Sequence, residues 1–139
     1  MHTYNTTIEI EAQTLNEMVN ASVVPFGFEY QKLLADNLTD LIRLKKDAGI
    51  KIDEKALKDA KEHLADIVAK IYYVRRNAKE MVELLDKGAK LNHEKRAELY
   101  FEELKPIMDH IRRHVDALEQ VVSDEHWDLP KYREMLFLR

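Results

Sequence analysis

The sequence predicts an all-α protein, an antiparallel bundle of three long helices with a short, docked helical tail at the C-terminus. Two observations lead to this class. Apolar residues recur every three or four positions over nearly all of the 139 residues, which is the spacing of helices that bury one face. The chain also holds only three Gly and three Pro, too few for the many turns of an all-β fold. No linker or repeat divides it, so we expect a single domain over residues 1–139.

The first helix is expected from about Thr7 to Ala48. Each half has its own apolar stripe, and between them lie Pro25 and Gly27, which both weaken a helix. We therefore expect the helix to be kinked or broken near Pro25. Gly49 should end it, because glycine adopts the positive φ of a C′ residue at little cost. The stripes are Ile8, Ala12, Leu15, Val19 and Ser22 or Val23, then Leu34, Leu38, Leu41 and Leu44 or Lys45.

The second helix, from Glu54 to Asp86, has the strongest pattern. Its apolar residues are spaced alternately three and four apart, an unbroken heptad seam that indicates packing along the whole length. Asp53 can cap its N-terminus, because a carboxylate accepts from the free amide groups of the first turn. Gly88 is expected to be its C′ residue. The seam consists of Leu57, Ala60, Leu64, Ile67, Ile71, Val74, Ala78, Met81 and Leu85.

A third helix is expected from about Glu94 to Val122, with Asn92 as its N-cap. Pro106 lies inside its apolar stripe. Because proline cannot donate to the carbonyl four residues earlier, we expect a kink there. The stripe consists of Ala97, Tyr100, Leu104, Ile107, Ile111, Val115, Leu118 and Val122.

The connections and the tail complete the predicted architecture. The links at 49–52 and 87–91 are short, which favours successive helices that lie side by side and antiparallel. The tail, from Ser123 to Arg139, breaks the helical pattern but is rich in large apolar side chains. Such groups are seldom left unpacked at a chain end, so we expect the tail to dock. The candidate interaction residues are Trp127, Tyr132, Leu136 and Phe137.

Composition excludes several classes of function. The 22 basic and 26 acidic residues give a net charge of −4, so nucleic acid is not expected as a partner. The absence of cysteine excludes a disulfide scaffold, a Cys-ligated zinc site and thiol catalysis. No apolar run approaches the roughly 20 residues of a membrane span, and the first residues lack the pattern of a signal peptide. We expect a cytoplasmic protein with no membrane contact.

Three histidines are candidates for chemistry. His110 and His114 lie four apart on one predicted helix, a spacing by which two imidazoles can share a metal. However, no Glu or Asp precedes a histidine by three positions, so the Glu-x-x-His pattern of di-iron bundles is absent. A partly buried structural role is therefore favoured for His114. His63 could accept a phosphoryl group, but the residues after it lack the Lys-Gly expected of such a site.

Basic pairs at 75–76 and 112–113 could hold phosphate or an acidic partner. Solvated faces with helical ion pairs are the favoured interpretation. The pairs expected at the second site are Asp109 with Arg113 and Arg112 with Asp116. Since the chain has no Gly-rich phosphate loop and no Ser nucleophile elbow, we expect no catalytic, cofactor-binding or metal-binding residues in it.

The run WDLPKYREMLF, from Trp127 to Phe137, resembles the C-terminal end of type III glutamine synthetases of Bacteroides-like bacteria. Those chains end in a similar Trp, Leu, Lys-Tyr-Arg-Glu and Leu-Phe run. The segment 8–14 is similar to the family's first helix after the catalytic core, and the segment 111–116 precedes the tail as it does there. The resemblance spans essentially the whole chain, and departs from the family at Asp128 and around Pro25.

The resemblance implies a C-terminal helical fragment of a larger ATP-dependent ligase that makes L-glutamine from L-glutamate and ammonia. ATP and Mg²⁺ would bind in a β-rich core upstream, and the resemblance implies no catalytic residue here. The implied partners are the catalytic core of the same chain and neighbouring subunits of a homo-oligomer. The alternative, on the residues alone, is a free-standing helical module for protein–protein interaction.

Overall fold

The computed structural model describes residues 2–121, and over this range the chain is helical and contains no strand. The predicted all-α class is confirmed. There are three continuous helical segments, at 2–47, 54–89 and 93–121, of which the first two are long and the third is shorter. The elements are α1 (His2–Met18), the π-helical turn η1 (Val19–Val23), α2 (Val24–Asp47), α3 (Glu54–Ala89), α4 (His93–Leu99), the π-helical turn η2 (Tyr100–Leu104) and α5 (Lys105–Val121).

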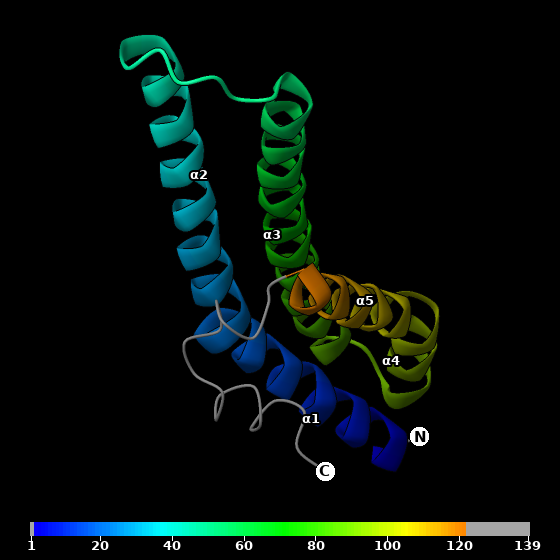
Figure 1. Ribbon diagram of the computed structural model, residues 1–139. Coiled ribbons are helices and arrows are strands. Elements are labelled where there is room, and N and C mark those ends of the chain that lie inside the picture. The colour runs from blue at the N-terminus through cyan, green and yellow to red at the C-terminus, as the bar shows by residue number, and fades with distance from the viewer. Residues whose placement is uncertain (1, 122–139) are drawn as a thin grey trace.

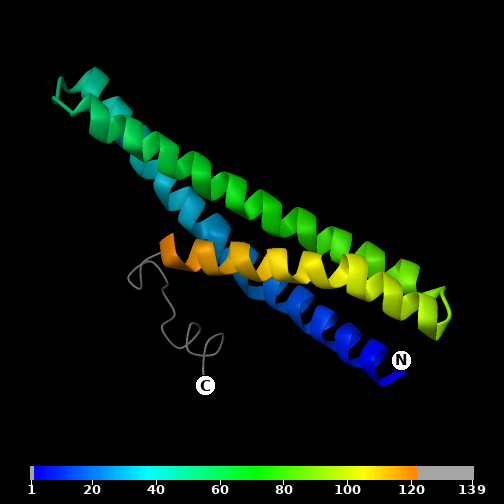
Figure 2. The same ribbon diagram turned by 90° about the vertical axis from the view of Figure 1, so that its right-hand side faces the viewer.

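The central element is α3, which is flanked by different helices along its length (Figures 1 and 2). α2 packs along its first half, and α5 lies beside its second half. α1 crosses beneath them and contacts α3, α4 and α5. Figure 2 shows that the pair formed by α2 and α3 extends well beyond the end of α5. Within residues 2–121, no helix combines the length and the apolar character needed to cross a bilayer.

Two prolines inside the helices each follow a π-helical turn by two residues. Pro25 follows η1, where the Val24 amide donates to the Val19 carbonyl five residues earlier. Pro106 follows η2, where the Lys105 amide donates to the Tyr100 carbonyl. A proline ring clashes with the carbonyl four residues back, and a wider turn shifts that carbonyl away. The helix therefore continues through Pro25 without a break, while Figure 1 shows α1 and α2 pointing in different directions.

Local capping signals identified three helix ends. The Asp53 carboxylate accepts from the Lys55 amide at 2.8 Å, and the Asn92 side chain accepts from the Lys95 amide at 2.9 Å. Both N-caps are as predicted. Gly49 follows the last turn of α2 with φ of +65°, which confirms it as the C′ residue.

The prediction for Gly88 was wrong. α3 continues through Ala89, so Gly88 lies inside the helix, where it is buried. The Tyr100 ring is pressed against its backbone: a β-carbon built on Gly88 would stand 2.5 Å from Cε1 of that ring. Glycine is needed here for close approach and not for a positive φ.

The predicted stripes form one core. The stripe of α1 and those of the middle of α3 and of α4–α5 are buried, except that Ile107 is half-buried and Val122 lies outside the described residues. Met108 and Phe26 join this core although they lay outside the predicted stripes. Gly27 lets α2 approach α3, since a β-carbon there would stand 2.8 Å from Cγ1 of Ile71. The second stripe of α2 behaves differently. Leu34, Leu38 and Leu41 are only half-buried and Leu44 is exposed.

Candidate functional site

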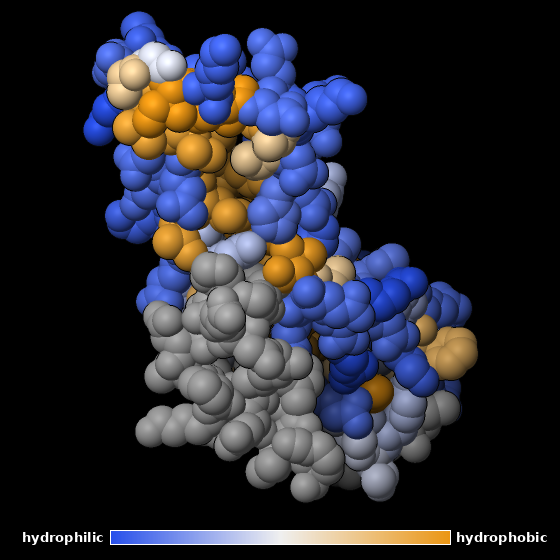
Figure 3. All heavy atoms as spheres, in the orientation of Figure 1, coloured by the Kyte–Doolittle hydropathy of each residue, from blue (hydrophilic) through white to orange (hydrophobic). Residues whose placement is uncertain are grey.

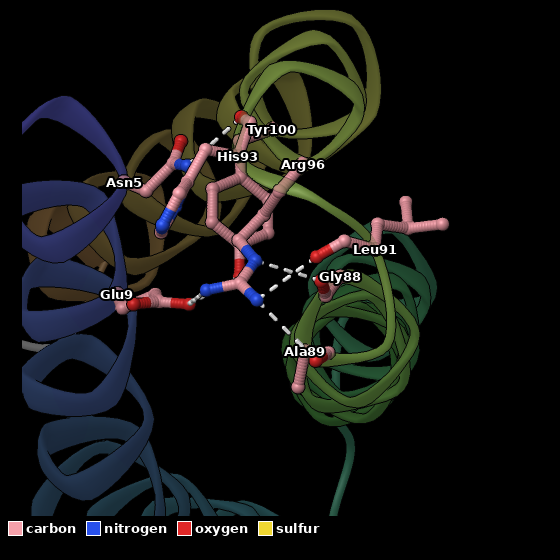
Figure 4. A network of polar contacts seen from close by, with 8 residues as sticks. All are labelled: Asn5, Glu9, Gly88, Ala89, Leu91, His93, Arg96 and Tyr100. Carbon is pink, nitrogen blue, oxygen red and sulfur yellow. Dashed lines mark hydrogen bonds and ion pairs between the residues drawn. The ribbon is translucent and has the colours of Figure 1, made fainter. Parts of the chain in front are cut away.

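The most extensive polar network surrounds Arg96, at the junction of α3 and α4 (Figure 4). Its guanidinium donates to the carbonyl oxygens of Gly88 at 2.8 Å, Leu91 at 3.0 Å and Ala89 at 3.3 Å. These carbonyls lie in and just beyond the last turn of α3, where a helix runs short of amide donors, although the Gly88 carbonyl also accepts from the Leu91 amide at 3.0 Å. A cation there also interacts favourably with the helix dipole. Arg96 thus caps the C-terminus of α3 from outside the helix.

The same network reaches α1. Oε2 of Glu9 lies 3.7 Å from Nη1 of Arg96 and accepts a hydrogen bond from the Tyr100 hydroxyl at 2.6 Å. One turn earlier, the buried Asn5 amide donates to the His93 carbonyl at 3.1 Å. Burial, followed by the hydrogen bond to Glu9, raises the pKa of Tyr100 well above its usual value. We call Asn5, Glu9, Arg96 and Tyr100 the junction clamp, because they hold α1 to the α3–α4 junction.

The junction clamp was not predicted from the sequence. Glu9 and Tyr100 are 91 positions apart, and no local pattern relates them. The one available signal was the position of Arg96 shortly after the end of a helix, where basic side chains often bond the last carbonyls. The arrangement joins three helix ends and stabilises them.

The histidines have structural partners. His114 is half-buried, and its ring stacks on Tyr73 of α3 with centroids 5.8 Å apart and planes at 15°, so its predicted structural role is confirmed. His110 is exposed and accepts from Arg113 at 2.9 Å. Nε2 of His63 lies 2.9 Å from the Tyr30 hydroxyl. Among residues 2–121, no group of three His, Asp or Glu side chains could hold a metal ion.

We expect His114 to make stability depend on pH. Burial, together with His110, Arg113 and Lys70, lowers the pKa of His114 below its usual value. The unfolded chain therefore binds a proton before the folded chain does, so the free energy of unfolding should fall as pH drops from neutral through about 6.5. Thermal melts between pH 8 and 5 measure this change. In a His114→Gln variant this part of the slope should be missing, and an unchanged slope would contradict the assignment.

The basic pairs interact with their own neighbours. Arg112 pairs with Asp109 at 3.3 Å, and Arg113 donates to His110 at 2.9 Å. Both predicted pairings were therefore wrong. On a helix, a residue three positions away is as close a neighbour as one four positions away. At the other patch, Arg76 pairs with Glu80 at 3.2 Å.

The basic pair Arg75 and Arg76 lies beside an open hollow. The Arg75 guanidinium lies over the Phe28 ring, 5.5 Å from its centroid, and Nη1 of Arg76 donates to the Tyr72 hydroxyl at 3.1 Å. With Asn16 and Asn20 across from them, these arginines line a hollow of about 880 Å³. These contacts fit the predicted solvated face, because both guanidinium groups interact with side chains of the same chain. The four tail residues predicted for docking, Trp127, Tyr132, Leu136 and Phe137, lie outside the described residues.

Comparison with known proteins identifies the chain's relatives. Residues 1–42 match the family model of the glutamine synthetase C-terminal domain. Over 137 residues the chain is 31% identical to a glutamine synthetase of Bacteroides fragilis (strain YCH46), and over 140 residues it is 27% identical to the type-3 glutamine synthetase of Dictyostelium discoideum. Each alignment covers 98% of this chain but 18% of the relative's length. The chain is therefore similar over nearly its whole length to glutamine synthetases, a type-3 enzyme among them, and its first 42 residues match the model of their C-terminal domain.

Proposed function

We propose that this chain is the structural and assembly domain of a type-3 glutamine synthetase. The observation that carries the proposal is the alignment of both relatives with 98% of the chain. The packing supports it, because a connected set of polar groups, Arg96, Tyr100 and Glu9, joins helices to one another. In this proposal the helices form an antiparallel bundle that bends at η1 and serves as a rigid body on which other parts of the enzyme pack.

The rest of the proposal concerns the parent enzyme. Formation of L-glutamine from L-glutamate and ammonia, with ATP and Mg²⁺, would take place in the part of the enzyme that this chain does not span. The partners would be that catalytic core and neighbouring subunits of a cytoplasmic homo-oligomer. The domain would contribute contacts and rigidity, and no group that touches substrate.

Two measurements test the proposal. The isolated chain should form no glutamine above background when supplied with ATP, Mg²⁺, glutamate and ammonia. Deleting the matching region from the Bacteroides relative should lower the number of subunits per particle, which light scattering gives as the particle mass divided by the mass of the shortened chain, because subunit contacts are lost. Glutamine formation by the isolated chain would overturn the proposal, as would a shortened enzyme that keeps its full number of subunits and its activity.

A free-standing interaction module is the second candidate. It is favoured by the exposed apolar side chains of α2, namely Leu33, Ile42 and Leu44, since such groups can recruit a partner helix. The genomic reading frame separates the two functions. A frame that continues upstream into a catalytic core supports the assembly domain, and a frame that starts at this segment supports the module.

A further inference from the structure

The apolar stripe of α2 changes from buried to exposed along its length. Phe26 and Tyr30 are 9% and 8% exposed, Leu34 and Leu41 are half-buried, and Leu44 is 43% exposed. These residues are three, four or seven positions apart and so share one face of the helix. Leu33, beside this face, is 38% exposed. Figure 3 shows apolar side chains gathered between the upper halves of α2 and α3.

The change coincides with the end of α5. Leu118, near the C-terminal end of α5, is buried and lies close to Gly27 of α2. Three residues later the described part of α5 ends at Val121, and Figure 2 shows α2 and α3 running on past that end. Beyond Val121, α2 lies beside α3 alone among the described helices. We call the part of the stripe beyond it, Leu33, Leu34, Leu41 and Leu44, the open face.

We propose that residues 122–139 of this same chain cover the open face. The segment follows Val121, the last described residue of α5, and Leu118 just before it lies close to Gly27 of α2, so the segment is attached near the edge of the surface. Its 18 residues reach at least about 27 Å even at the short rise of a helix. The open face from Leu33 to Leu44 is about 16 Å long on the same scale. The segment is therefore long enough in any regular conformation.

Composition also fits this occupant. Besides Val122, the segment contains seven large apolar side chains, Trp127, Leu129, Tyr132, Met135, Leu136, Phe137 and Leu138. An apolar face and an apolar segment joined by one short connection have a high effective concentration for each other. Association within the chain is therefore favoured over a second copy at low protein concentration. The inference does not depend on the proposed enzyme, because it concerns contacts within this chain.

Cysteine labelling tests the proposal, because the chain contains no cysteine of its own. A Leu44→Cys variant of the full chain should react with a maleimide several-fold more slowly than the same variant that also carries Trp127→Ser and Leu136→Ser. Val68→Cys is the matched control. Val68 is 44% exposed and lies outside the α3 seam, so its labelling rate should not respond to the tail substitutions.

The single tryptophan of the chain, Trp127, supplies a second readout. In the intact chain its emission should be blue-shifted relative to the unfolded chain, and Leu44→Glu should shift it to the red while Val68→Glu does not. Both substitutions are at exposed positions, and circular dichroism checks that the helices persist. Equal labelling of Leu44→Cys with and without the tail substitutions would overturn the proposal. So would protection that appears only as the chain dimerises with rising concentration, which would assign the face to a second copy.

Discussion

Replacing Arg96 with methionine is expected to lower the free energy of unfolding by about 3 kcal/mol. The substitution keeps the apolar stem but removes the guanidinium donors to the Gly88 and Leu91 carbonyls, which they bond at 2.8 and 3.0 Å. It also leaves Glu9 without its cation, in a place where both side chains are largely covered. Urea unfolding followed by circular dichroism gives the change.

Arg112 offers a matched control for this prediction. Its guanidinium pairs with Asp109, and both side chains are about half exposed. Such a surface pair contributes roughly 0–1 kcal/mol, so Arg112→Met should be nearly neutral. The loss of unfolding free energy for Arg96→Lys should lie between the losses for the two methionine variants. An ammonium keeps the charge but cannot reproduce the planar, forked donation of a guanidinium. Equal losses for Arg96→Met and Arg112→Met would show that the junction clamp does not stabilise the fold.

Replacing Gly88 with alanine is expected to cost about 2 kcal/mol of unfolding free energy. In most helix interiors this substitution stabilises by roughly 0.5–1 kcal/mol, because glycine loses more backbone entropy on folding. Here the added carbon would stand 2.5 Å from the Tyr100 ring. The ring cannot yield easily, because it is fully buried and its hydroxyl is bonded to Glu9 at 2.6 Å. Denaturant unfolding measures the loss.

A double-mutant cycle separates the clash from other effects. In a Tyr100→Leu background the ring is gone, so Gly88→Ala should change sign and become stabilising. The Tyr100 titration gives an independent readout. If alanine displaces the ring from its site, the phenol should ionise at a lower pH than in the unmodified chain, whose burial and Glu9 contact raise the pKa. A destabilisation of the same size in both backgrounds would exclude the ring contact as the cause.

Residues close together in the sequence were the reliable guide to the helices. The heptad seam from Leu57 to Leu85 predicted α3 because a period near 3.6 places its members on one face. Asp53 and Asn92 predicted helix starts because a cap bonds an amide two or three residues away. Gly49 predicted a helix end for a similarly local reason, the backbone preference of a single residue. In each case the interaction that decides the structure lies within one turn of the helix.

Contacts between distant segments decided the rest. Whether Gly88 ends a helix or admits a ring depends on Tyr100, and whether Leu44 is covered depends on which segments pack against α2. The junction clamp joins Glu9 to residues almost ninety positions away. The sequence by itself determined which segments are helical and which face of each is apolar, because those properties depend on neighbours in the chain. Only the tertiary structure decided which faces meet and which stay open, because that depends on helix lengths and on contacts that no local pattern encodes.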